Sequence, residues 1–269
     1  FQVAAQSLGA DQIHSNAFVV DEFKYWHARL LLKMGVAAEW DRWSAGLAIT
    51  TPSLGVVGDG SVYQSASLSG DYDPDNPGPD EPYLQTSNQE ELDPVWRSPL
   101  SIAVGGAVNL GQTRVHVTAE WFDSVDHYAI MNPARYEVQS EPGEFRQIQV
   151  EYGARNVVNY GLGVDHAFGE SFSLFTSYRV DHATTPDYLE DSISIAVWDL
   201  SHVSGGASFK LLNLDFTAGL QFSWGEGLTD DFPVFSEDEF GNMVAVNDEQ
   251  VVSYRRLKAL LGFNLPFSV

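Results

Sequence analysis

The sequence predicts an all-β protein, an up-and-down antiparallel β-barrel that spans a membrane. Three observations predict this fold class: apolar residues alternate with small or polar ones, the alternating segments are about 9–13 residues long, and aromatic residues gather at their ends. Strands of soluble β-sandwiches usually have about 5–6 residues, whereas a strand that crosses a bilayer at a tilt needs about 9–11. Strand length therefore favours a wall in lipid over a sandwich.

The alternation is first clear between residues 26 and 40. The even positions there carry Trp, Ala, Leu, Met and Val, whereas the odd positions carry most of the charges. Shorter segments repeat this pattern at 43–50, 100–108 and 114–121. Apolar side chains on every second residue place one face of each strand against lipid and the other toward a lumen.

The second half of the chain behaves in the same way. Alternation continues at 148–168, 172–181, 203–211 and 214–224, and the last segment places Leu257, Ala259, Leu261, Phe263, Leu265, Phe267 and Val269 on one face. About nine strands result, and residues 1–8 resemble the end of a preceding one, so we expect about ten visible strands because bacterial single-chain barrels have an even number. The aromatic ends are formed by Trp26, Trp40, Trp43, Trp121, Tyr160, Phe168, Phe172, Trp224 and Phe267.

Short and long connections alternate along the chain. The long ones are predicted at about 52–97, 125–145, 182–192 and 225–251 and hold most of the Pro, Asp and Glu. This alternation is typical of outer-membrane barrels, with long loops outside and short turns in the periplasm. We therefore expect residues 1–269 to form a single domain in the bacterial outer membrane, with a periplasmic C-terminus.

Composition excludes several classes of protein. The formal net charge is -23, which would repel a phosphate backbone and makes nucleic acid an unsuitable partner. Cysteine is absent, so disulfides and thiolate metal sites are not expected. No apolar run approaches the length of a membrane-spanning helix, and no signal peptide precedes the first strand.

Two stretches resemble the FadL/TodX-type outer-membrane transporters of hydrophobic compounds. They are residues 25–62, which contain "TTPSLG", and residues 96–122, which contain "SPLSIAVG". The resemblance implies a 14-stranded barrel, an N-terminal hatch in the lumen, and passage of fatty acids or aromatic hydrocarbons. No hatch is evident in the sequence, which therefore looks like a barrel without its N-terminal part; "NPA" at 132–134 is similar to a hatch tripeptide but lies in a predicted long loop.

Alternation also selects the ionisable residues that face the lumen. These candidates for lining the lumen or binding a ligand are His27, Arg29, Lys33, Glu39, Arg114, His116, Glu120, Asp165, Arg179, Asp181, Asp215 and Lys258. Their mixed signs suit ion pairs that rigidify the interior, or a polar conduit for a ligand head group. Arg29 and Arg114 are the candidates for bidentate binding of a carboxylate.

Metal binding and catalysis receive weaker signals. Asp71, Asp73 and Asp75 have the oxygen ligands and the spacing that suit Ca²⁺, but Asn76 replaces the glycine of an EF-hand loop and prolines interrupt it. Ser101, His116 and Glu120 share the predicted inner face, yet no Gly-rich phosphate loop, HExxH or GxSxG motif occurs. We predict that the protein is not an enzyme and has no cofactor apart from this weak Ca²⁺ candidate.

The sequence thus predicts an outer-membrane channel that admits hydrophobic small molecules, fatty acids or aromatic hydrocarbons, by passive diffusion. Two alternatives stay open: a barrel that anchors an envelope or surface partner through its acidic loops, and a general diffusion porin. Inward Leu31, Phe175 and Leu260 favour a narrower lumen than that of a porin. The expected partners are outer-membrane lipid, lipopolysaccharide and a hydrophobic ligand.

Overall fold

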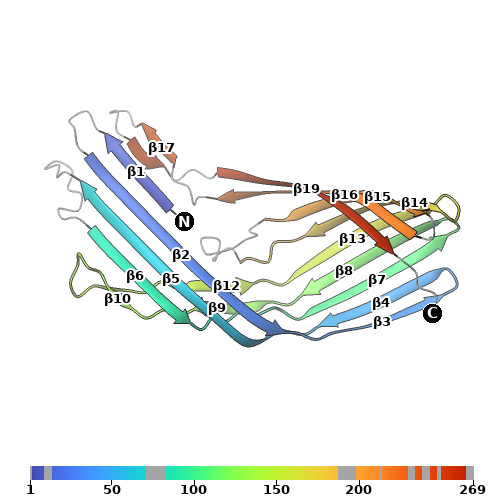
Figure 1. Cartoon of the computed structure of the whole chain (residues 1–269), viewed down its shortest axis with the longest axis horizontal. Coiled ribbons are helices and arrows are strands. Elements are labelled where there is room, and N and C mark those ends of the chain that lie inside the picture. The colour runs from blue at the N-terminus through green and yellow to red at the C-terminus, as the bar shows by residue number, and fades with distance from the viewer. Residues whose placement is uncertain are drawn as a thin grey trace.

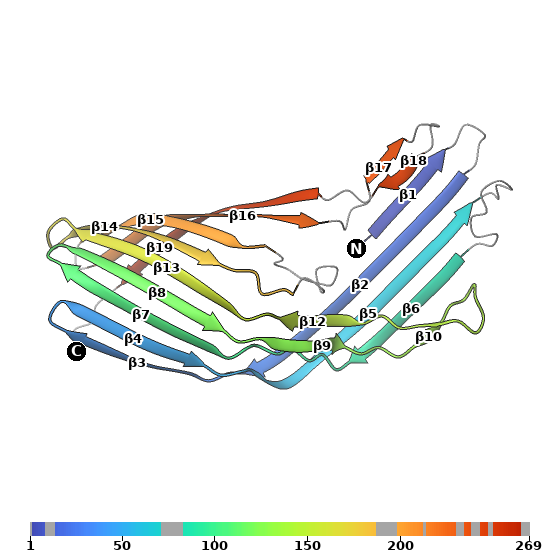
Figure 2. The same cartoon turned by 180° about the vertical axis from the view of Figure 1, so that it is seen from behind.

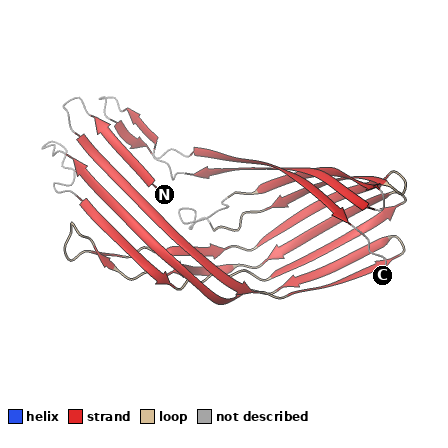
Figure 3. Cartoon of the chain, viewed as in Figure 1, coloured by secondary structure: helices blue, strands red, loops and turns tan. Residues whose placement is uncertain are grey.

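The computed structural model describes residues 2–8, 14–70, 83–186, 198–211, 214–229, 234–237, 243–246 and 250–264. These residues form strands, turns and loops, and none of them belongs to a helix that could cross a membrane (Figure 3). The strands are β1 Gln2–Leu8, β2 His14–Leu30, β3 Lys33–Trp40, β4 Trp43–Thr50, β5 Leu54–Gly70, β6 Tyr83–Leu92, β7 Ser101–Leu110, β8 Thr113–Phe122, β9 Val125–Met131, β10 Tyr136–Glu137, β11 Phe145–Arg146, β12 Val150–Ala154, β13 Val157–Ala167, β14 Phe172–Asp181, β15 Leu200–Leu211, β16 Leu214–Thr229, β17 Val234–Glu237, β18 Met243–Val246 and β19 Gln250–Asn264.

A nine-stranded antiparallel sheet, here called the wall, forms one half of the molecule. Its order, β3-β4-β7-β8-β13-β14-β15-β16-β19, follows the chain, so each strand pairs with the next wall strand (Figure 1). Two-residue turns close β3 to β4 and β7 to β8, and Asp41 and Gly111 in these turns have φ of 51° and 69°. The described short turns, between β3 and β4, β7 and β8, and β13 and β14, lie at one end of the wall (Figure 2). This meander confirms the predicted all-β barrel architecture.

The strand length and the bare apolar face of the wall suit a bilayer. Ten-residue strands such as β7 and β8 extend about 34 Å, which at a tilt of about 40° covers roughly the 25 Å apolar band of a barrel. Outward side chains are uncovered, with Val36 at 70%, Leu261 at 86% and Phe263 at 77% exposure. Soluble proteins rarely leave so much contiguous apolar surface in water, so this face is suited to contact with lipid.

Aromatic residues border this apolar face at both ends. Trp40 pairs with Trp43 at one short turn, and the rings of Phe168 and Phe172 lie 5.7 Å apart at another. Trp121, Tyr160 and Trp224 lie toward the opposite ends of their strands. Of the remaining predicted aromatics, Trp26 lies in β2 beyond the wall, and Phe267, like Leu265 and Val269, lies outside the described residues.

The strands are interrupted at one level, here called the waist, where the wall meets the other half. The interruptions are residues 31–32, 51–53, 93–100, 123–124 and 155–156. Backbone hydrogen bonds hold this level together: Thr51 donates to Leu32 at 2.9 Å, and Asp123 donates to Leu100 at 2.9 Å. The predicted continuous strands at 26–40 and 148–168 are therefore each two strands.

Beyond the waist lies the extended module, in which much of the predicted loop sequence forms strands. Four strands pair in the order β1-β2-β5-β6, and β9 pairs with β12. β5 and β6 lie within the predicted loop 52–97, and β9 lies within 125–145; β16 and β19 extend into 225–251. Pairing within these additional sheets and along the extensions of β16 and β19 satisfies backbone groups that an irregular loop would leave to water.

A small hydrophobic core joins the two layers of the extended module. Val62 of β5, Ile130 and Met131 of β9 and Val150 of β12 are buried, and Phe23 of β2 packs against them. Met131 lies directly over Gly60, where an added Cβ would come within 2.6 Å of its sulfur. The two layers are therefore in side-chain contact, and this contact closes the space between them.

The bilayer environment of the wall can be tested with one buried-charge substitution. Val117 points outward at the middle of β8. Val117→Lys should lower the free energy of unfolding of the vesicle-embedded protein by about 2–4 kcal/mol, because a cation at the bilayer midplane is poorly solvated. Urea titration of the protein folded in vesicles measures this loss. Thr118→Lys, one residue along and inward, is the control; equal losses for both variants would contradict a lipid-facing Val117.

Candidate functional site

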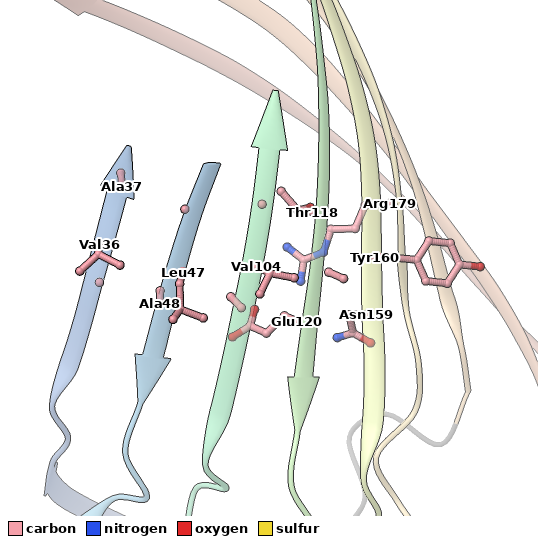
Figure 4. Close-up of a pocket in the computed structure, with 15 residues that line it drawn as sticks. Val36, Ala37, Leu47, Ala48, Val104, Thr118, Glu120, Asn159, Tyr160 and Arg179 are labelled. Carbon is pink, nitrogen blue, oxygen red and sulfur yellow. The ribbon is translucent and has the colours of Figure 1, made fainter. Parts of the chain in front are cut away.

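The inner surface of the wall contains a cavity over a floor of very small residues. β3, β4 and β7 contribute only glycine and alanine inward at the level of the cavity, namely Gly35, Ala37, Gly46, Ala48, Ala103 and Gly105. The cavity has a volume of about 530 Å³ and is bordered by Thr118, Glu120, Asn159 and Arg179 (Figure 4). This lumen cavity lies in the size range of ligand pockets, about 300–1,000 Å³.

The charged groups at the edge of the lumen cavity already have partners. Ser101 Oγ donates to Glu120 Oε1 at 2.8 Å, and Arg179 Nε donates to Asp181 Oδ1 at 2.5 Å. His202 Nε2 lies 3.1 Å from the other oxygen of Asp181. Figure 4 shows the Arg179 side chain directed toward Thr118 and Glu120, so a neutralised guanidinium borders an apolar floor.

A second group of predicted lumen residues forms pairs nearer the short turns. His116 Nε2 lies 2.5 Å from Asp165 Oδ2, and Arg114 donates to Ser44 Oγ at 2.9 Å with Glu39 at 3.8 Å. Cross-strand register brings these residues together, since Arg114 stands opposite Asp165. These contacts match the predicted ion-pair ladder; whether the ladder also conducts a ligand stays a prediction.

The remaining predicted residues lie apart from the lumen cavity. Asp215 lies 3.8 Å from Lys210 on the neighbouring strand β15. Lys258 and Lys33 lie on β19 and β3, the two end strands of the wall. Arg29 donates to Ser98 Oγ at 2.9 Å at the waist. Because Arg114 lies near the short turns and Arg29 at the waist, the two do not converge on one carboxylate.

The residues weighed for catalysis do not form a triad. Ser101 donates its hydrogen bond to Glu120, whereas His116 is paired with Asp165. In the register of β7 and β8, Ser101 stands opposite Phe122 and His116 opposite Ala107. Ser101 and Ala107 are six positions apart, about 20 Å along a strand. The serine and histidine are therefore too far apart for proton transfer.

The weak calcium candidate cannot be placed. Asp71, Asp73 and Asp75 lie outside the described residues. Within the part of the chain that the structure describes, no three histidine or carboxylate side chains are grouped as metal ligands.

Four aromatic residues from distant segments meet at the waist, and sequence reasoning did not identify them. Trp96 lies 4.4 Å from Tyr152 and 6.2 Å from Tyr25, measured between ring centroids, and Tyr128 meets Tyr152 edge-on at 5.9 Å. These four residues are called the waist aromatics. Burial raises the pKa of the Tyr128 and Tyr152 hydroxyls, so both stay neutral at physiological pH.

A second cavity, here called the side pocket, adjoins the waist aromatics. It has a volume of about 340 Å³ and lies between the start of β5 and residues 93–97. His27 and Arg97 line it together with Val56, Val57, Pro94 and Trp96. Trp96 thus belongs both to the side pocket and to the waist aromatics.

The "NPA" segment at 132–134 is held in place by two glutamine side chains. Gln89 donates to the carbonyl of Ala134 at 2.8 Å and accepts from its amide at 2.7 Å. Gln147 donates to Asn132 Oδ1 at 3.0 Å and to the carbonyl of Pro133 at 2.8 Å. The tripeptide therefore belongs to the extended module, where Pro133 is fully buried.

Comparison with known proteins supports the predicted fold. No protein-family model and no curated protein matches the sequence. The structure is similar to that of the CymD monoaromatic hydrocarbon channel, with a TM-score of 0.53 and 10% identity over 99% of this chain and 78% of that chain. A FadL homologue from Pseudomonas aeruginosa gives a TM-score of 0.46 and 9% identity over 96% of this chain and 76% of that chain.

The similarity to CymD shows a shared fold, and it confirms at that level the predicted resemblance to FadL/TodX-type transporters. CymD is named as a monoaromatic hydrocarbon channel, and at 10% identity the similarity shows the fold alone.

The pairing of Arg179 predicts how the lumen cavity treats anions. Asp181→Asn removes the carboxylate partner and leaves the guanidinium unpaired at the edge of the cavity. Benzoate should then bind about tenfold or more tightly than to the wild type, because a hydrogen bond to a charged group contributes about 1.5–3 kcal/mol. Isothermal titration in detergent measures the affinity.

Asp165→Asn is the matched control for that substitution. It removes a carboxylate from the same inner face, but its partner is His116 and not Arg179. An equal gain in benzoate affinity for both variants would indicate a general effect of the lower negative charge and would contradict a role for Arg179.

Proposed function

We propose that this chain forms the wall of an outer-membrane channel that admits uncharged hydrophobic small molecules, in particular aromatic hydrocarbons, by passive diffusion. The observation that carries the proposal is the lumen cavity, which combines a glycine and alanine floor with a rim on which Arg179 is paired with Asp181 and Glu120 accepts a hydrogen bond from Ser101. An apolar molecule loses little by leaving lipid for this floor, because the floor presents no charged side chain that has to be desolvated.

The character of the inner surface also supports a hydrocarbon over a fatty acid. A carboxylate needs a cation or several donors at its binding site. Arg179, which borders the lumen cavity, already binds Asp181, and Asp181 also contacts His202. A fatty-acid head group would therefore have to displace an existing ion pair.

A general diffusion porin is the less suitable alternative. Porins need a wide, water-filled lumen. In this chain Phe175 lies against Gly206 and Gly219 on the inner face of the wall, and the two layers of the extended module are in contact through Met131 and Gly60. Both features narrow the interior and favour small apolar solutes over hydrated sugars.

The fold of CymD, a monoaromatic hydrocarbon channel, is consistent with this proposal. We further propose that the outward face of the wall binds outer-membrane lipid, with the short turns toward the periplasm and the extended module outside. The outward apolar side chains support the first part of this proposal, and the contrast between short turns and long extensions supports the second.

Filling the lumen cavity tests the proposed function. Ala48→Phe projects a ring over the floor and should reduce toluene uptake by reconstituted vesicles several-fold, because the ring occupies the space that the solute needs. Toluene uptake can be followed with a toluene-oxidising reporter enzyme inside the vesicles. Glucose uptake is measured in parallel, because a general diffusion porin would admit glucose.

Ala45→Phe is the control, since Ala45 lies outward on the same strand opposite Gly106. It should leave toluene uptake unchanged. Rapid glucose entry through the wild-type protein, or equal effects of both substitutions, would contradict the proposed function.

A further inference from the structure

Trp96 lines the side pocket and also contacts aromatic residues of other segments at the waist. One side of the residue lines the side pocket together with His27 and Pro94. Its ring also stacks on Tyr152 of β12, with 4.4 Å between the ring centroids. No other waist aromatic lines the side pocket as the structure describes it.

The backbone around Trp96 is held more firmly than its side chain. Val95 donates to the carbonyl of Ile130 at 2.8 Å, and the amide of Ser98 donates to Ser53 Oγ at 2.9 Å. The ring itself is held by stacking on Tyr152 and Tyr25 and by Arg29, whose guanidinium lies 6.0 Å from the ring centroid. Ring contacts of this kind are individually weak, so the indole can change rotamer while the chain stays in place.

The side pocket has the size and lining that suit one small aromatic ring. Its volume of about 340 Å³ exceeds the roughly 150 Å³ of a cavity known to bind benzene. Trp96, His27 and Pro94 offer flat surfaces for stacking, and Val56 and Val57 add aliphatic contact. Leu54 and Val56, which border the pocket, are largely exposed, so part of the pocket's lining is accessible to a solute.

Trp96 contacts both the side pocket and the small hydrophobic core of the extended module. Ile130, Met131 and Val62 of that core are almost completely buried, and Trp96 packs against them. A solute that moves from the side pocket past Trp96 displaces one ring, which exposes less apolar surface than parting the buried side chains of the core.

We propose that the side pocket is an entry site for an uncharged monocyclic aromatic molecule and that Trp96 is the gate between this site and the lumen. The incoming ring stacks on Trp96, and rotation of the indole away from Tyr152 opens the way inward. This inference rests on the proposed function, because it concerns how the same solute enters the same lumen.

Uptake of toluene by vesicles containing the full chain tests the gate. Trp96→Ala should raise the toluene uptake rate several-fold and should admit glucose, which the wild type excludes, because the barrier at the waist is lost. Val56→Trp should lower toluene uptake, because it fills the pocket from its exposed side and leaves Trp96 in place. Trp26→Ala, an outward residue on β2, is the control and should match the wild type.

Binding is measured separately by quenching of tryptophan fluorescence with toluene. Trp96→Phe should lose the saturable part of the quenching that the wild type shows, whereas Trp26→Phe should keep it. Circular dichroism and heat-modifiable migration identify any variant that fails to fold, in which case Val56→Trp and Trp96→Phe still decide the outcome.

The possible outcomes distinguish this inference from the proposed function. If the wild type takes up toluene and no substitution of Trp96 or Val56 changes the rate, the gate is overturned and the channel function stays intact. A wild type that takes up no toluene would overturn the channel function and the gate with it.

Discussion

The structure depends on one constraint, that backbone hydrogen bonds in a lipid environment must be made within the protein. Hydrocarbon offers no partners to peptide groups, so each interior strand of the wall pairs with a neighbour on both sides, as β15 does with β14 and β16. The pairing in turn fixes which side chains face outward. Leu162 lies between Val117 and Tyr178, and Phe222 lies between Val203 and Leu257. A continuous apolar surface is therefore a consequence of the ladder.

The same constraint places most of the polar chemistry of the wall on the inner face. Every second residue is available there, and the chain uses these positions in two ways. β3, β4 and β7 carry glycine and alanine, which leave the lumen cavity open. The other wall strands carry pairs such as His116 with Asp165 and Lys210 with Asp215, which join neighbouring strands. One sheet thus contains both the open floor of the lumen cavity and neighbouring strands that are joined by side-chain pairs.

The sequence predicts the wall well because a period of two is a strong signal, and it misses the waist because two-residue interruptions preserve that period. The break at 31–32 leaves the outward positions even on both sides, and the break at 155–156 leaves the apolar positions even, although Val150 and Tyr152 before it face the core of the extended module. The break at 51–53 changes the parity, and a bulge opposite Ala28 and Arg29 restores it. Inward residues could be selected from parity alone, but their partners depend on the register between strands. Trp96 and Tyr152, 56 positions apart, give no sequence signal of their contact.

The distribution of charge, in addition to the shape of the interior, affects which solutes are favoured. The inward ionisable residues of the wall are nearly balanced in sign, as the pairs of Arg114 with Glu39 and Arg179 with Asp181 illustrate, so the chain's net charge of -23 resides mainly elsewhere. Much of that charge belongs to acidic segments such as 70–81. Negative charge on a protein disfavours anions within a Debye length of about 8 Å at physiological salt. A solute without charge does not experience this repulsion, so its approach is favoured over that of an anion, most strongly at low ionic strength.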